Sequence, residues 1–186
     1  MSFEFQPLEI PDLVVLRPKV FNDERGFFKE IYKFSEFFAA GIRKPFLQAN
    51  HSLSKRNTLR GLHYQKKPFA QAKLVRVLRG EIFDVAVDIR KGSLFYGKYF
   101  SLTLSAESHQ MLFIPEGFAH GFLTISEEAE VEYLCSEVYS PEHERGIAFN
   151  DPILNIPWPL TTPVVSKKDS LYPSLERVDN NFIYEK

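Results

Sequence analysis

The sequence predicts a mainly β protein with a jelly-roll barrel, a few short helices and an irregular C-terminal segment. Three observations predict this fold: apolar residues alternate with polar ones in short runs, turn signals separate these runs, and helix signals are few. The chain of 186 residues fits one domain. We expect the barrel core at roughly residues 45–140 and a C-terminal wrap over residues 141–186.

The clearest strand pattern lies between the turn signals Arg79-Gly80 and Arg90-Lys91-Gly92. Within it, one face carries apolar side chains and the other carries Asp84, Ala86 and Asp88. The apolar face consists of Phe83, Val85, Val87 and Ile89. Aromatic residues make up 15% of the chain, with 18 Phe and 8 Tyr, which suits a β-rich core or a cleft lined for stacking.

Helix signals are limited to two short segments. The first is Ser35 to Gly41, where Ser35 is expected as the N-terminal cap and Gly41 as the stop. The second is expected near Pro141 to Glu144. The segment from Asp151 to Pro173 contains too many prolines for inner strands, so it should wrap the outside of the barrel.

Composition excludes several classes of partner. A formal net charge of −1 provides no basic field for nucleic acid. No apolar run reaches the ~18–20 residues that span a bilayer, and the N-terminus lacks the features of a signal peptide. Cys135 is the only cysteine, so no intrachain disulfide can form. We expect a soluble cytoplasmic protein.

The first candidate site is the stretch Leu59 to Gln65, which contains Arg60 and His63. An arginine can bind an anion and a histidine can move a proton near neutral pH. Strict alternation would place the two side chains on opposite faces of a strand. Gly61 offers a solution, because a glycine inside a strand often marks a bulge that redirects its neighbours. The alternative is that His63 is a strand histidine satisfied by backbone hydrogen bonds.

The second candidate is His120, in the stretch Pro115 to Gly121. This stretch resembles the second motif of the cupins, which are small β-barrel proteins. The first cupin motif requires His-x-His to hold a metal, but here Gln65 stands two residues after His63. A metal usually requires at least three suitable protein ligands. We therefore expect no metal site.

Two further residues could carry chemistry in a strand setting. Tyr133 could donate a proton, although the usual role of a buried tyrosine is that of a core aromatic with a bonded hydroxyl. Lys73 lies on an apolar strand face, where a lysine is more often an edge or snorkelling residue. Arg25, Arg60, Lys73 and Lys168 could together bind a diphosphate.

Several motifs together resemble the dTDP-4-dehydrorhamnose 3,5-epimerase family. They cover roughly residues 5 to 170, and they are Asp23 to Glu30, Gln48 to Ser52, Arg60 to Gln65, Lys73 to Arg90, Pro115 to Gly121 and Asn150 to Pro152. The resemblance implies a cupin-type jelly roll that works as a homodimer without a cofactor. It also implies epimerisation at C3 and C5 of dTDP-4-dehydro-6-deoxy-D-glucose.

The resemblance also implies roles for individual residues. His63 would be the base, Asp169 its partner, Tyr133 the proton donor on the other face, and Tyr139 the ring that stacks on thymine. We expect Lys73 to stabilise the enolate oxygen. The other implied substrate-binding residues are Arg25, Glu30, Gln48, Ala49, Asn50, Arg60, His120, Glu144 and Lys168. The sequence departs from the family's usual residues at Ala49, Phe149 and Lys167.

Two other functions stay open at this level. A single-site epimerase or a 3,4-ketoisomerase on a related dTDP-sugar would share the fold and part of the site, although Tyr64-Gln65 does not supply the second nearby histidine typical of the ketoisomerases. A barrel that binds a sugar nucleotide without turnover is also compatible with this fold, because fold does not fix function.

Overall fold

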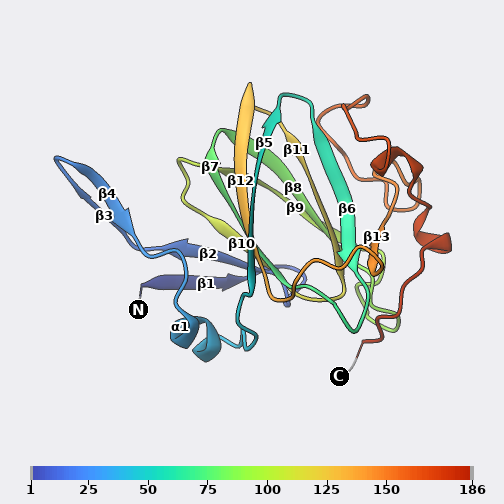
Figure 1. Ribbon diagram of the computed structural model, residues 1–186, viewed down its shortest axis with the longest axis horizontal. Helices are drawn as coiled ribbons and strands as arrows, with labels where there is room; N and C mark the ends of the chain where they lie inside the picture. Colours follow the sequence, from blue (N-terminus) through green and yellow to red (C-terminus); the bar gives the residue numbers. More distant parts are fainter. Residues whose placement is uncertain (1, 185–186) are drawn as a thin grey trace.

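The computed structural model describes residues 2–184 and contains two large antiparallel sheets that face each other (Figure 1). The six-stranded sheet has the order β1 (Phe3–Pro7), β2 (Val14–Pro18), β10 (Met111–Ile114), β7 (Lys73–Arg79), β12 (Glu128–Cys135) and β5 (Gln48–Lys55). The five-stranded sheet has the order β13 (Glu144–Gly146), β6 (Leu59–Gln65), β11 (Phe118–Thr124), β8 (Glu81–Asp88) and β9 (Tyr99–Ser105). The predicted mainly β jelly roll is confirmed.

Strand β8 has the predicted alternation, and both of its faces are buried. Ile82 and Ala86 join the cluster between the two sheets, whereas Val85, Val87 and Ile89 join a second cluster. The second cluster packs under the C-terminal segment through Ile156, Leu175 and Phe182. This segment includes two short 3-10 helices, η1 (Asp169–Leu171) and η2 (Leu175–Arg177). The C-terminal segment therefore covers the outer face of the five-stranded sheet.

The N-terminal third covers part of the other sheet and extends beyond it. Helix α1 (Phe34–Ala39) buries Phe37 against the outer face of β1, β2 and β10. A separate hairpin of β3 (Val20–Asp23) and β4 (Gly26–Lys29) projects away from the barrel (Figure 1). The hairpin rings Phe21, Phe27 and Phe28 are all at least half exposed. The hairpin thus presents apolar surface that this chain leaves uncovered.

Three sequence expectations differ from the structure. Helix α1 begins one residue before Ser35, and its cap position, Lys33, makes no side-chain cap hydrogen bond. The helix expected near residues 141–144 is wrong: the backbone N–H groups of His143 and Glu144 both donate to Ser140 O in a turn, and the chain then pairs with β6 as β13. Strands β1, β2 and β13 also lie outside the expected core at residues 45–140. No helix within residues 2–184 is long and apolar enough to span a bilayer.

Candidate active site

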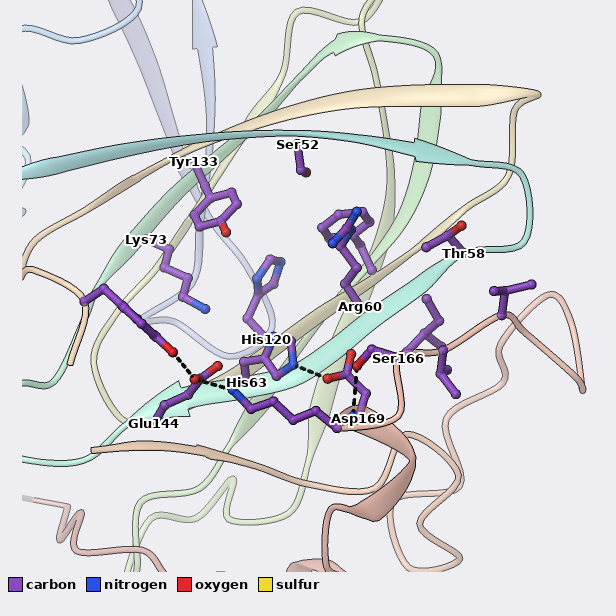
Figure 2. Close-up of a pocket in the computed structure, with 16 residues that line it drawn as sticks. Ser52, Thr58, Arg60, His63, Lys73, His120, Tyr133, Glu144, Ser166 and Asp169 are labelled. Carbon is purple, nitrogen blue, oxygen red and sulfur yellow. Dashed lines mark hydrogen bonds and ion pairs between the residues drawn. The ribbon is translucent and has the colours of Figure 1, made fainter. Parts of the chain in front are cut away.

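A cavity of about 560 Å³ opens between the two sheets (Figure 2). The five-stranded sheet lines it with Arg60, His63 and His120, and the six-stranded sheet with Lys73 and Tyr133. Tyr139, Glu144, Lys168 and Asp169 complete the rim and one wall. A smaller adjoining cavity of about 210 Å³ adds Gln48 and Asn50. Most residues that the sequence marks as site candidates thus lie around one space.

Arg60 and His63 reach the same cavity because β6 contains a bulge. His63 pairs with His120 and Arg60 pairs with Phe122, so Gly61 and Leu62 together face the single residue Gly121. Gly61 has φ +133°, and a Cβ at this position would lie 2.5 Å from the Gly121 Cα. A side chain is therefore excluded where the bulge requires close backbone approach. The expectation that Gly61 redirects its neighbours is confirmed.

His63 forms a dyad with Asp169, which the C-terminal segment returns to the cavity. His63 Nε2 lies 2.9 Å from Asp169 Oδ1, and the Gly61 N–H donates to Asp169 Oδ2 at 3.2 Å. Burial raises the pKa of the Asp169 carboxyl, but its hydrogen bonds outweigh this effect and leave that pKa below its ordinary value. An ionised Asp169 fixes His63 Nε2 as a donor, which leaves Nδ1 free to accept a proton.

A second histidine–carboxylate pair lies deeper in the barrel. His120 Nε2 lies 2.9 Å from Asp84 Oδ2, and the Asp84 side chain has no exposed surface. Burial lowers the pKa of His120, although Asp84 opposes this shift. Sequence reasoning assigned Asp84 no role. The available signal was a carboxylate sharing a strand face with the buried residues Ile82 and Ala86, where an unpaired charge is costly.

The opposite wall carries Tyr133 and Lys73, which neighbouring strands bring together. The Lys73 Nζ lies 6.0 Å from the centre of the Tyr133 ring. Burial raises the pKa of Tyr133, so its phenol keeps its proton at neutral pH. Burial lowers the pKa of the Lys73 ammonium, an effect that Cys135, Asp84 and Glu144 oppose. This wall therefore presents a protonated phenol and a lysine amine toward the dyad side of the cavity (Figure 2).

Tyr139, Glu144 and Lys168 form a polar network at the rim. The Tyr139 hydroxyl donates to Glu144 Oε2 at 2.6 Å, and Lys168 Nζ bonds the same oxygen. Burial raises the pKa of Glu144, but Lys168 and Tyr139 together bring it below its ordinary value. Tyr139 is half exposed, so part of its surface is accessible to a ligand.

Three of the candidate residues line neither cavity. Arg25 lies on the projecting β3–β4 hairpin, where its guanidinium is paired with Asp23 at 2.6 Å, and Glu30 directly follows the hairpin. Ala49 is exposed on the edge strand β5. Within residues 2–184, no group of three or more His, Cys, Asp and Glu side chains is placed to hold a metal ion.

The arrangement is suited to proton transfer on both faces of one bound molecule. A neutral imidazole held by a carboxylate can act as a base, and a phenol across the cavity can act as an acid. Lys73 can donate hydrogen bonds to an oxyanion, and the Arg60 guanidinium can bind an anionic ligand. Such a set can invert a carbon centre that lies next to a carbonyl group.

Comparison with known proteins gives a consistent result. The family model described as dTDP-4-dehydrorhamnose 3,5-epimerase matches residues 7–177. The enzyme of that name from Shigella flexneri is 53% identical over 162 residues, covering 87% of this chain and 90% of its own. An epimerase structure from Legionella pneumophila, solved with dTDP-4-keto-L-rhamnose, has a TM-score of 0.95 at 41% identity and covers 99% and 100% of the two chains.

A further related structure has a narrower activity. ChmJ of Streptomyces bikiniensis, described as a 3'-monoepimerase in complex with dTDP-quinovose, has a TM-score of 0.86 at 33% identity, with 92% and 87% coverage. The family model spans nearly the whole chain, and the Shigella relative is more than half identical. The chain belongs to the dTDP-4-dehydrorhamnose 3,5-epimerase family.

Proposed function

We propose that this protein inverts C3 and C5 of dTDP-4-dehydro-6-deoxy-D-glucose to give dTDP-4-dehydro-L-rhamnose. The observation that carries the proposal is the placement of the His63–Asp169 dyad and Tyr133 on opposite walls of one cavity. Family membership supports the choice of substrate. Both C3 and C5 flank the C4 ketone, so deprotonation at either carbon gives an enolate that a neighbouring cation can stabilise.

Each inversion needs one proton removed from one face and one returned to the other. His63 Nδ1 takes the proton, and the electrons of the broken C–H bond form the enolate with its charge on O4. Tyr133 then donates a proton to the same carbon from the opposite face, and the O4 carbonyl is restored. The His63 imidazolium releases its proton to solvent and Tyr133 regains one, which returns the enzyme to its starting state. General acid–base assistance is typically worth about 10²–10⁴-fold.

Two cations have separate tasks in this scheme. Lys73 lies beside Tyr133 at the inner wall and stabilises the charge on O4; one well-placed donor contributes about 3–4 kcal/mol to such a step. Arg60 lies on β6 beyond the bulge and binds the diphosphate, for which a planar guanidinium is well suited. Asp84 keeps His120 oriented in the deep part of the cavity. The nucleotide then extends toward the rim, where Tyr139 stacks on the thymine and Gln48 and Asn50 bind its polar edge.

We further propose that the active form is a cytoplasmic homodimer. The β3–β4 hairpin carries Arg25 together with three exposed Phe rings, and it projects away from its own barrel. A second copy of the chain would cover the rings and could receive Arg25 and Glu30 near its nucleotide. This gives a role to two candidate residues that line neither cavity of their own chain. The sole cysteine, Cys135, is buried and unbridged, as suits a reducing compartment.

The second candidate function is single-site epimerisation, which the similarity to the 3'-monoepimerase ChmJ favours. One experiment separates the two functions. The enzyme is incubated with dTDP-4-dehydro-6-deoxy-D-glucose in deuterated water, and NMR of the product counts the centres that carry deuterium. Inversion with deuterium at both C3 and C5 supports the proposal. Deuterium at C3 alone would assign a 3-epimerase, and binding without exchange would assign a catalytically silent barrel.

A further inference from the structure

The loop that carries Tyr139 is held by glutamine side chains. It covers residues 136–140 and follows β12 at the end of the six-stranded sheet. Gln71 Nε2 donates to Glu137 O at 2.8 Å, and Gln65 Nε2 donates to Val138 O at 3.1 Å. The Tyr139 N–H donates to Gln48 Oε1 at 2.8 Å. The Ser140 N–H donates to Gln65 Oε1, also at 2.8 Å. Backbone groups at four consecutive positions are thus satisfied by three amides.

Gln65 is the central member of this set. It comes from β6 of the opposite sheet, is only 4% exposed, and bonds the loop on both sides of Tyr139. Its second N–H donates to Phe69 O at 2.7 Å, so both amide donors are already used within the protein. A side chain whose donors are used in this way has none to offer a ligand. Gln65 is also the residue that stands in place of a second histidine two positions after His63.

The Tyr139 ring depends on this anchorage. The ring is half exposed, and its hydroxyl has a single partner, Glu144. If the loop were loose, ordering Tyr139 would cost part of the binding free energy each time a ligand stacks on it. The hydrogen bonds of the dyad do not involve the loop: His63 bonds the Asp169 carboxylate, the Gly61 N–H donates to that carboxylate, and the Asp169 N–H donates to Ser166 Oγ.

We propose that Gln65 is a positioning residue that fixes the Tyr139 loop and thereby sets the affinity for the nucleotide end of the substrate. The inference rests on the proposed function, in which Tyr139 stacks on thymine. It assigns Gln65 to nucleotide binding rather than to proton transfer or metal ligation. Loss of its hydrogen bonds should therefore raise KM much more than it lowers kcat.

The test is a double-mutant cycle on Gln65→Met and Tyr139→Ala, with dTDP affinity measured by calorimetry. Base–aromatic stacking and single hydrogen bonds give expected losses of about 10–100-fold for Tyr139→Ala and about 3–10-fold for Gln65→Met. The double variant should bind dTDP within about twofold of Tyr139→Ala alone, because the two residues act through one contact. For Gln65→Met, kcat should stay within about threefold of wild type, since general acid–base groups are untouched.

A matched control and a second variant keep the test decisive. Gln6→Met removes an amide on β1 that bonds Arg17 far from the cavity, and it should leave dTDP affinity unchanged. Gln65→Glu retains an acceptor for Ser140 but removes both donors, and it should reproduce the affinity loss if Gln65→Met does not fold. Hydrogen exchange of residues 137–140 should be faster in either Gln65 variant, with no ligand present.

The possible failures can be told apart. Faster loop exchange with unchanged dTDP affinity, or additive losses in the cycle, would overturn the inference and leave the proposed function intact. A wild-type enzyme that binds dTDP but does not turn over the dTDP-sugar would refute the proposed function. The double-mutant cycle would still decide the role of Gln65 in that case, because it is measured on dTDP alone.

Discussion

The two walls of the cavity hold their polar groups in different ways. On the five-stranded sheet both histidines are tethered to carboxylates, His63 to Asp169 and His120 to Asp84, at 2.9 Å in each case. On the six-stranded sheet, neither the Tyr133 hydroxyl nor the Lys73 ammonium makes a hydrogen bond with residues 2–184. One wall is organised before substrate arrives, and the other presents groups whose hydrogen bonds are free for the substrate.

This difference fits the separate roles of a base on one wall and of hydrogen-bond donors on the other. A base must have the correct tautomer before each turnover, which a fixed carboxylate provides. A proton donor and an oxyanion donor act only on a developing charge, so their bonds are best made with the substrate. Loss of Tyr133 should therefore block the return of the proton, whereas loss of His63 or Lys73 should slow its removal.

Tyr133→Phe should separate deprotonation from inversion. The phenol is the proposed donor, so completed inversion should fall by about 10²–10⁴-fold, while wash-in of deuterium at the starting configuration persists. Both rates can be followed by NMR in one reaction in deuterated water. Equal loss of exchange and inversion would mean that Tyr133 is not the donor. Tyr96→Phe, on the β8–β9 connection outside the cavity, is the matched control.

Lys73→Met should slow the first step instead. The variant keeps an unbranched side chain one atom shorter but removes the amine beside the enolate oxygen, so deuterium exchange at both centres should fall by about 10²–10³-fold. The KM for the dTDP-sugar should change little, because Lys73 acts mainly on charge that develops in the transition state. A rise in KM with unchanged kcat would move Lys73 from catalysis to binding.

Asp169→Asn should show how much the ionised Asp169 carboxylate contributes to the free energy of unfolding at each pH. The folded pKa of Asp169 lies below its ordinary value, so its stabilisation is complete above pH ~4 and is lost as pH falls through the folded pKa. At pH 7 the variant should lose about 1.5–3 kcal/mol in the free energy of unfolding, as for a hydrogen bond to a charged group. Urea titrations at several pH values should show that the difference in unfolding free energy between wild type and variant shrinks as pH falls. A difference that grows as pH falls would contradict an Asp169 carboxylate that is stabilised in its ionised form.

Phe28→Ser should weaken assembly while leaving the proton-transfer groups of each chain in place. Phe28 is 66% exposed on the projecting hairpin. If a second copy covers it, removing the ring should raise the dimer dissociation constant by at least about tenfold, given ~1.5–3 kcal/mol for burial of a large apolar side chain. Sedimentation over a concentration series measures this constant. Leu94→Ser, at another exposed apolar position, should leave it unchanged, and an equal effect of both variants would remove the hairpin from the interface.

Local sequence patterns predicted features that depend on a few neighbouring residues. Alternation around Val85 identified a strand with two distinct faces, and Gly61 indicated the bulge that turns Arg60 and His63 to one cavity. The helix expected near Pro141 to Glu144 was wrong, because the strand that contains Glu144 depends on pairing with Gln65 far away in the sequence. Asp84 was missed for a similar reason, since its partner His120 lies 36 residues further along the chain.

The candidate site residues likewise divide into those that local sequence indicates and those that depend on distant parts of the chain. His63, Lys73 and Tyr133 were singled out from the sequence pattern, Asp169 was named only through resemblance to a family, and the fold brings all four to one cavity. Composition and spacing alone could not pair His63 with Asp169, because 106 residues separate them. Arg25 and Glu30 line neither cavity of this chain, so their role depends on the proposed homodimer.

In the proposed mechanism, His63 removes the protons at both C3 and C5. Its most direct test is deuterium exchange into dTDP-4-dehydro-6-deoxy-D-glucose catalysed by His63→Asn, with His51→Asn, on the outer face of β5, as control. We predict that His63→Asn, shown to be folded and to bind dTDP, loses exchange at both centres by at least about 10²-fold, whereas the control keeps wild-type rates. Normal exchange at either centre in His63→Asn would contradict the claim.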